Sequence, residues 1–118
     1  MALVSALAVG CGGALGAVSR FAVAEAIERR VVDTALVNVV GSLLFGIVLG
    51  LDAGGPTSLA ATTGFCGAFT TFSSFAVETV RLAEKGHVAS AITNAGGTLL
   101  VAFAAVLIGI VIGSAAAP

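Results

Sequence analysis

Eight hydroxyl and amide side chains lie in the apolar stretches of this sequence, and they are the groups that could bind a small ion or solute. Each can donate a hydrogen bond and also accept one. Because none carries a fixed charge, the set suits a small anion, which must be held strongly enough to lose water and weakly enough to leave. We therefore predict a permeation pathway. The eight residues are Asn38, Ser42, Thr70, Thr71, Ser73, Ser74, Asn94 and Thr98.

The remaining reactive residues form no catalytic or metal-binding pattern. No Asp or Glu is expected near the centre of a membrane-spanning segment, which argues against a carboxylate proton relay. Cys11 and Cys66 fall in apolar segments, where thiols behave mostly as small hydrophobic groups. His87 is the only histidine, and its neighbours Lys85 and Gly86 indicate a solvated loop. We predict that the chain is not an enzyme.

The most unusual stretch is Gly64–Phe75, with the sequence GFCGAFTTFSSF. It lies in an uncharged run, residues 53–77, that is long enough to cross a bilayer. Gly64 and Gly67 weaken a helix here, and hydroxyl groups follow them at membrane depth. Irregular backbone at that depth persists only where protein buries it or where it lines a wet cavity. The stretch therefore predicts a broken helix at an ion or solute site.

Two aromatic rings follow the predicted break. Phe72 and Phe75 are three residues apart, so both would lie on one face of a helix that resumes there. An aromatic ring has a positive edge, and two rings presented edge-on could coordinate an anion without trapping it. Ordinary packing is the alternative interpretation of such a pair, although the neighbouring glycines and hydroxyl groups favour the first.

The composition predicts an integral membrane protein built from helices. Only 9% of the 118 residues are charged and 58% are hydrophobic, whereas soluble domains carry about a quarter charged residues. Few aromatic residues and no regular alternation argue against a membrane barrel. Four apolar segments of about twenty residues use nearly all of the chain. We predict one all-α transmembrane domain, residues 1–118, with helices at about 3–26, 34–51, 57–80 and 88–113, the third one broken.

Small residues at four-residue spacing predict close helix packing. Gly12 and Gly16 form one such pair in the first segment, and Gly109 and Gly113 form another in the fourth. The second segment carries a stripe at the same spacing, in which Asn38 could either bind an anion or hydrogen-bond between helices. The members of this stripe are Asn38, Ser42, Gly46 and Gly50.

The cationic residues are confined to one predicted side of the membrane. The predicted loops are residues 28–33, 52–57 and 81–87. Arg29–Arg30 lie in the first loop, Arg81 and Lys85 in the third, and the second has no Lys or Arg. Because Lys and Arg in short loops favour the cytoplasm, both termini should lie outside. Arg20, near the end of the first segment, could reach the interface or attract ions at a pore entrance.

Three motifs in chain order resemble the Fluc/CrcB family of fluoride ion channels, and the resemblance covers essentially the whole chain. Gly13–Phe21 (GALGAVSRF) is similar to the family's first-helix motif, including its arginine. Thr34–Gly46 (TALVNVVGSLLFG) is similar to the second-helix motif with its pore asparagine. Gly64–Phe75 resembles the most distinctive signature of the family.

The resemblance implies roles for individual residues. Phe72 and Phe75 match the phenylalanines that contact fluoride, and Asn38 and Thr98 match polar positions along the ion path. The resemblance further implies a structural sodium ion at the centre of a dimer, held by backbone carbonyls, which are suitable ligands for a hard cation. The sodium positions are Gly67 and Thr70, the family arginine is Arg20, and Glu78 is an acidic position near a pore end.

The fourth segment departs from the family pattern. Asn94 stands where the family often has a tyrosine, and Ala102 replaces a hydroxyl residue of some members. Ala68 also replaces a frequent glycine in the third segment. The signature itself is intact.

The implied function is a channel in the plasma membrane through which cytoplasmic fluoride leaves passively, which lowers its toxicity. Four helices are too few to enclose a pore, so a dimer is needed, and the family pairs its subunits antiparallel. The partner is left open. It is either a second copy of this chain or, given the uneven distribution of Lys and Arg, an oppositely oriented paralogue.

Two other functions are compatible with the chain length. A small multidrug-type exporter would need a membrane-embedded glutamate in the first helix and aromatic residues that hold cations. Here Glu25 and Glu28 lie at the end of that helix, and Trp and Tyr are absent. A non-conducting assembly protein would explain the glycine pairs but not the broken third helix.

Overall fold

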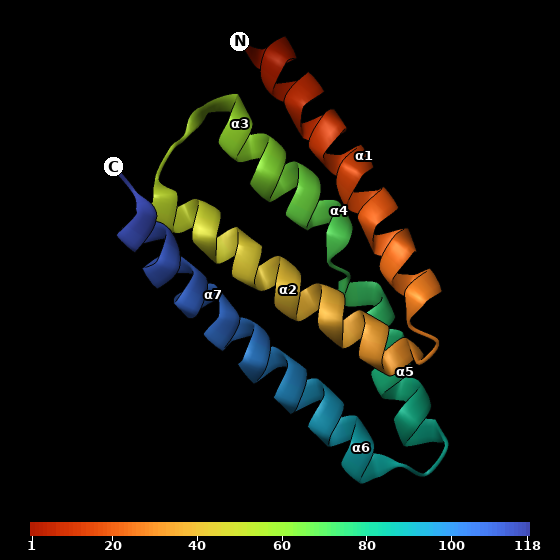
Figure 1. Cartoon of the computed structure of the whole chain (residues 1–118). Helices are drawn as coiled ribbons and strands as arrows, with labels where there is room; N and C mark the ends of the chain where they lie inside the picture. The colour runs from red at the N-terminus through yellow and green to blue at the C-terminus, as the bar shows by residue number, and fades with distance from the viewer.

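The computed structural model describes residues 1–118 as four helical passes without strands (Figure 1). The first two passes are single helices, α1 (Ala2–Ala26) and α2 (Arg30–Leu51). The third pass is interrupted and comprises α3 (Gly55–Leu59), the π-helix η1 (Ala60–Cys66), α4 (Gly67–Phe69) and α5 (Phe72–Glu84). The fourth comprises α6 (Val88–Ile92), the π-helix η2 (Thr93–Gly97) and α7 (Thr98–Ala116). The predicted all-α class with a broken third pass is confirmed.

Three of the passes are long and apolar enough to cross a membrane as one helix, namely α1, α2 and the run Val88–Ala116. The third pass leaves the helical conformation at Thr70 and Thr71, so it is not one helix of that length. In Figure 1 both termini and the turn after α2 lie at one end of the molecule. The connections at residues 27–29 and 85–87 lie at the other end, called the loop end below.

The first connection is shorter than the predicted loop, residues 28–33. The second helix begins at Arg30 rather than at residue 34, so only residues 27–29 are outside helices. The predicted loop, residues 28–33, is charged but contains neither Gly nor Pro. Its charges alone do not interrupt the helix. Asp33 lies in the first turn of α2, where the partial positive charge of a helix N-terminus favours a carboxylate.

The break in the third pass lies at Thr70 and Thr71, beyond the glycines that were expected to weaken the helix. Both threonines have extended backbone, with ψ angles of 164° and 120°. Threonine tolerates this conformation well because it is β-branched. The side-chain oxygen of Thr71 also caps α5, since it accepts a hydrogen bond from the backbone amide of Ser74 at 3.2 Å.

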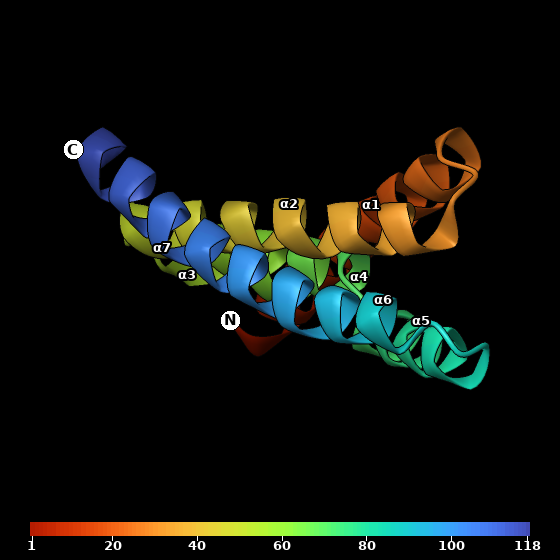
Figure 2. The ribbon, with the colours of Figure 1, turned by 90° about the horizontal axis from the view of Figure 1, so that it is seen from below.

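Glycines let α2 and α7 approach to backbone contact. A Cβ atom at Gly46 would meet the backbone of Val106, and one at Gly109 would meet the backbone of Leu43. Gly113 likewise lies against Ile47. The predicted glycine pair of the fourth pass is therefore confirmed as a packing surface. Figure 2 shows α7 crossing α2, with α5 beyond the packed region and close to α6.

A second glycine contact joins α1 to the first half of the third pass. Gly12 lies against the backbone of Ala60, and Gly16 lies against that of Phe65. Gly64 faces back to α1 in the same way. This glycine is therefore used for packing and remains helical, which explains why the helix does not break there. In Figure 1 the segment α3–α4 runs between α1 and α2.

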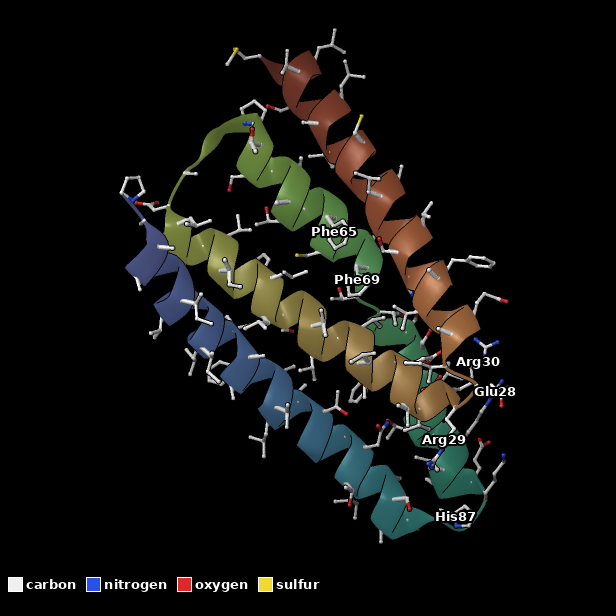
Figure 3. The ribbon with its side chains drawn as sticks, in the orientation of Figure 1. Glu28, Arg29, Arg30, Phe65, Phe69 and His87 are labelled. Carbon is white, nitrogen blue, oxygen red and sulfur yellow. The ribbon has the colours of Figure 1, made fainter.

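Charged side chains gather at the loop end. Figure 3 shows Glu28, Arg29 and Arg30 beside the start of α2 and His87 in the connection before α6. His87 is exposed and immediately precedes α6, in agreement with its prediction as a loop residue. The same figure shows Phe65 and Phe69 between α1 and α2, where their ring centroids are 5.4 Å apart.

Candidate functional site

Asn38 braces the break in the third pass. Its side-chain nitrogen donates to the carbonyl oxygen of Thr71 at 2.9 Å, and its side-chain oxygen accepts from the backbone amide of Thr71 at 2.7 Å. The two bonds satisfy an extended residue that has no helical partners, as burial in a membrane protein requires. An asparagine amide has two hydrogens, and the second is not used by this pair of bonds.

The break also releases backbone carbonyls at the end of α4. In a continuous helix the carbonyl of Gly67 would accept from the amide of Thr71, and that of Thr70 would accept from the amide of Ser74. Here the first amide donates to Asn38 and the second to the Thr71 hydroxyl. Gly67 is exposed, and no atom lies closer than 4.0 Å to the position of its missing Cβ. These two carbonyl groups have the chemistry that a hard cation requires.

The phenylalanine cleft, a hollow of about 230 Å³, lies beside the break. The rings of Phe72 and Phe75 have centroids 6.0 Å apart and planes tilted by 48°, which confirms that they share one face of α5. The cleft opens to the outside of the chain, and Phe72 is 76% exposed. The cleft is lined by Asn38, Ser42, Thr70, Thr71, Phe72, Phe75, Thr98, Leu99 and Ala102.

A second hollow, the α4 groove of about 360 Å³, lies on the other side of Thr70. Its lining includes Gly67 and two hydroxyl residues of η1, Thr62 and Thr63. Ser42 and Thr70 border both the groove and the phenylalanine cleft. Gly67 and Thr70, the residues whose carbonyls the break releases, therefore lie next to the polar residues of the cleft.

Arg20 and Glu78 are brought together elsewhere, around a small loop-end cavity of about 40 Å³. Arg20 donates to the hydroxyl of Ser74 at 3.0 Å. The hydroxyl of Thr34 lies 3.0 Å from Glu78 Oε1 and 3.1 Å from Asp33 Oδ1. One hydroxyl hydrogen can serve only one of these acceptors at a time. The other oxygen of Glu78 is buried and has no hydrogen-bond partner.

The predicted residues thus fall into three neighbouring places. Asn38, Phe72, Phe75 and Thr98 line one cleft, as the proposed pathway requires. Gly67 and Thr70 border the α4 groove, and Arg20 and Glu78 line the loop-end cavity.

The sequence interpretation missed the structural roles of Thr71 and Thr34. The sequence prediction treats Thr71 only as a hydroxyl group at membrane depth, although a Thr that precedes a helix is a typical N-cap. Thr34 lies one helical turn before Asn38, and this four-residue spacing could have indicated that both face the third pass. The predicted loop includes Asp33, whereas the structure buries this residue in the first turn of α2, where it is 6% exposed.

Four helical passes, one of them broken beside an uncharged polar cleft, define a multi-pass membrane protein of the channel or transporter class. The profile of the family described as "CrcB-like protein, Camphor Resistance (CrcB)" matches residues 7–110. The chain belongs to this CrcB family, as its three motifs indicated, and it is a multi-pass protein of the plasma membrane.

Three relatives show how far the similarity extends. The chain is 64% identical to "Fluoride-specific ion channel FluC 2" of Natronomonas pharaonis, over 98% of this chain and 99% of the relative. It is 50% identical to the protein of the same name from Haloarcula marismortui, over 84% and 85% of the two chains. It is 35% identical to "Fluoride-specific ion channel FluC" of Clostridium novyi, over 94% of each chain.

Proposed function

We propose that this protein is a fluoride channel through which cytoplasmic fluoride leaves the cell passively. The observation that carries the proposal is the phenylalanine cleft, where two aromatic rings and neutral polar groups meet without a fixed charge. Ring edges and donors from Asn38 and Thr98 can replace water around a small anion. No cationic side chain lines the cleft, so the ion is not trapped there. Relatives named as fluoride-specific ion channels support this function along nearly the whole chain.

The alternative of a multidrug-type exporter receives no support from α1. Glu25 and Glu28 lie at the end of this helix or just after it, and both are exposed. Neither is a carboxylate embedded in the middle of a pass, which a proton-coupled exporter of that type needs.

An antiparallel dimer completes the pathway in this proposal. The phenylalanine cleft is open along one side, and the high exposure of Phe72 supports a second subunit as the missing wall. Arg29, Arg30, Arg81 and Lys85 lie at or beside the loop end, which favours this end in the cytoplasm and both termini outside. A subunit with this bias inserts mainly one way and pairs with an oppositely oriented paralogue. The alternative partner is a second copy of this chain.

A structural sodium ion at the dimer centre is part of the proposal. The carbonyl oxygens of Gly67 and Thr70 would hold it, because the break has removed the helical partners of both. Bound there, the ion would supply a positive charge that offsets the carbonyl dipoles converging from two subunits. Asn38 contributes indirectly. It accepts the hydrogen bond of the Thr71 amide, which in a continuous helix would donate to the Gly67 carbonyl.

The test is fluoride efflux from liposomes that contain the purified protein. Replacing Phe72 or Phe75 with Ile keeps an apolar side chain but removes the ring edge. Each change should lower fluoride flux about tenfold, because an aromatic edge contact contributes up to about 1.5 kcal/mol. Phe103→Ile is the matched control, since Phe103 is a ring on α7 that is 65% exposed and does not line the cleft.

Elution as a single species in size-exclusion chromatography checks that the variants fold. Flux at the wild-type level in both ring variants would assign Phe72 and Phe75 to packing and remove the basis of the proposal. The partner is tested in the same assay. Flux from this chain expressed alone establishes the homodimer, whereas flux that appears only on co-expression with a paralogue establishes the heterodimer.

A further inference from the structure

A chain of hydrogen bonds connects the fourth pass to the backbone that carries Phe75. The hydroxyl of Thr98 donates to Asn94 Oδ1 at 3.4 Å, and Asn94 Nδ2 donates to the hydroxyl oxygen of Thr79 at 2.9 Å. The Thr79 hydroxyl in turn donates to the carbonyl oxygen of Phe75 at 2.8 Å. Every hydrogen in the chain is donated in the same direction. This series of hydrogen bonds begins at the Thr98 hydroxyl, which lines the phenylalanine cleft. It ends at the backbone carbonyl of Phe75, whose ring lines the same cleft.

This connection matters because side-chain hydrogen bonds, rather than buried packing, hold α5 in its orientation, and the others on this helix, from Arg20 to Ser74 and from Thr34 to Glu78, do not come from the fourth pass. None of its residues is buried, so core packing does not determine which way its rings point. Asn38 holds the residue that precedes the helix, Thr71. About two turns further along, the bond from Asn94 to Thr79 ties α5 to η2 of the fourth pass. Phe75 lies between these two attachments.

The same bonds determine where the Thr98 hydrogen points. A hydroxyl has a single hydrogen, and in this structure the acceptor is Asn94 Oδ1. A separation of 3.4 Å makes that bond weak. The hydrogen can therefore turn to an anion in the cleft at small cost, and Asn94 Oδ1 takes it back when the anion leaves. Asn94 thus affects both sides of the cleft, the ring on α5 and the hydroxyl on α7.

We propose that Asn94 and Thr79 are positioning residues of the ion pathway, which hold the Phe75 ring and the Thr98 hydroxyl at the separation that fits a bound fluoride ion. This inference rests on the proposed fluoride-channel function. Neither residue has to touch the ion. Their bond fixes α5 relative to the fourth pass, and a cleft whose two walls move independently binds a small anion more weakly.

The proposal is tested by removing the hydrogen-bonding group of Asn94 in one variant and that of Thr79 in another. Asn94→Leu and Thr79→Val each remove it while keeping a side chain of similar size. Each should raise the fluoride concentration at half-maximal flux about threefold, the equivalent of one interhelical hydrogen bond in a membrane protein. The effect of the double variant should be smaller than the sum of the two single effects, because both changes remove the same bond between Asn94 and Thr79. Maximal flux should stay near the wild-type value.

Two conservative variants serve as controls. Thr79→Ser keeps the hydroxyl and should behave as the wild type. Thr93→Val removes a neighbouring hydroxyl that is exposed and bonds only to the Ala89 carbonyl of its own helix, and it should also leave flux unchanged. Rescue by serine at position 79 distinguishes a lost hydrogen bond from a general loss of structure.

Several outcomes would overturn the inference. These are wild-type concentration dependence in both bond-deleting variants, additive effects in the double variant, or a fall in maximal flux with unchanged half-saturation. If Asn94→Leu does not fold, Thr79→Val compared with Thr79→Ser decides the question alone. Absence of fluoride flux from the wild-type protein, both alone and co-expressed with the paralogue, would instead reject the proposed function itself, and this inference with it.

Discussion

The two halves of the third pass are held in place in opposite ways. The half before the break packs its backbone against α1 through glycines, and it buries Gly64, Cys66 and Phe69. The half after the break, α5, buries no residue. Four side-chain contacts attach it and the residue before it to the rest of the chain, namely Asn38 to Thr71, Arg20 to Ser74, Thr34 to Glu78 and Asn94 to Thr79.

This difference separates the part of the protein that sustains the fold from the part that positions the pathway. Close backbone contact tolerates no added atoms, because an overpacked site costs about 1–3 kcal/mol or more. An interhelical hydrogen bond in a membrane contributes less, about 0.6 kcal/mol on average. Changes in the first half should therefore abolish folding, whereas changes around α5 should alter function in a protein that still folds.

The strongest test of this contrast is a matched pair of substitutions on α1. In Gly12→Leu the new side chain meets the backbone of Ala60, and we expect no folded protein to be recovered. Gly10→Leu makes the same change two residues earlier, where a Cβ meets nothing within 4 Å, and it should leave the yield unchanged. Yield of the single species in size-exclusion chromatography is the measurement. Equal yields of the two variants would contradict the role assigned to glycine packing.

Asn38→Leu should have an intermediate effect. It leaves the buried amide and carbonyl of Thr71 without partners, and each costs about 1–3 kcal/mol. Fluoride flux should be lost and the midpoint of thermal unfolding lowered, while part of the protein still folds. Ser42→Ala removes a bond within α2 only and should shift the midpoint far less. A thermal midpoint equal to that of the wild type would show that Asn38 does not brace the break.

Thr71→Val should have the smallest effect of the three. It removes the hydroxyl that caps α5 but keeps the β-branched shape, so the expected loss in the free energy of unfolding is about 1 kcal/mol. Thr71→Ser keeps the cap and should restore most of this loss. Denaturant titration of the purified protein measures the difference. A loss as large as that of Asn38→Leu would contradict the smaller role assigned to the Thr71 cap.

Features that depend on local composition and periodicity could be predicted from the sequence. The four passes follow from runs of apolar residues, and the contacts of Gly12 and Gly109 follow from their spacing to a second glycine. The shared face of Phe72 and Phe75 follows from helix geometry, and the motif Gly64–Phe75 indicated the family correctly.

Features that depend on a partner distant in the sequence could not be predicted from the sequence. The position of the break is determined by Asn38, which supplies hydrogen bonds to Thr71 from another pass and thereby replaces those of the helix. The glycine that was expected to break the helix, Gly64, is kept helical by its contact with α1. The bond between Asn94 and Thr79 likewise requires two passes to meet at one level, which no local pattern reports.

The π-helix η2 determines where the fourth pass can lose a residue. Its backbone hydrogen bonds span one residue more than those of an α-helix. Loss of Gly96 or Gly97 would let η2 become a regular helical turn, in which Asn94 and Thr98 are three residues apart and still share one face. Gly109 would keep facing α2, because the lost residue is the one that the wider turn accommodates. A deletion within α7 has no such turn to absorb it, and it would rotate the rest of the pass by about 100°.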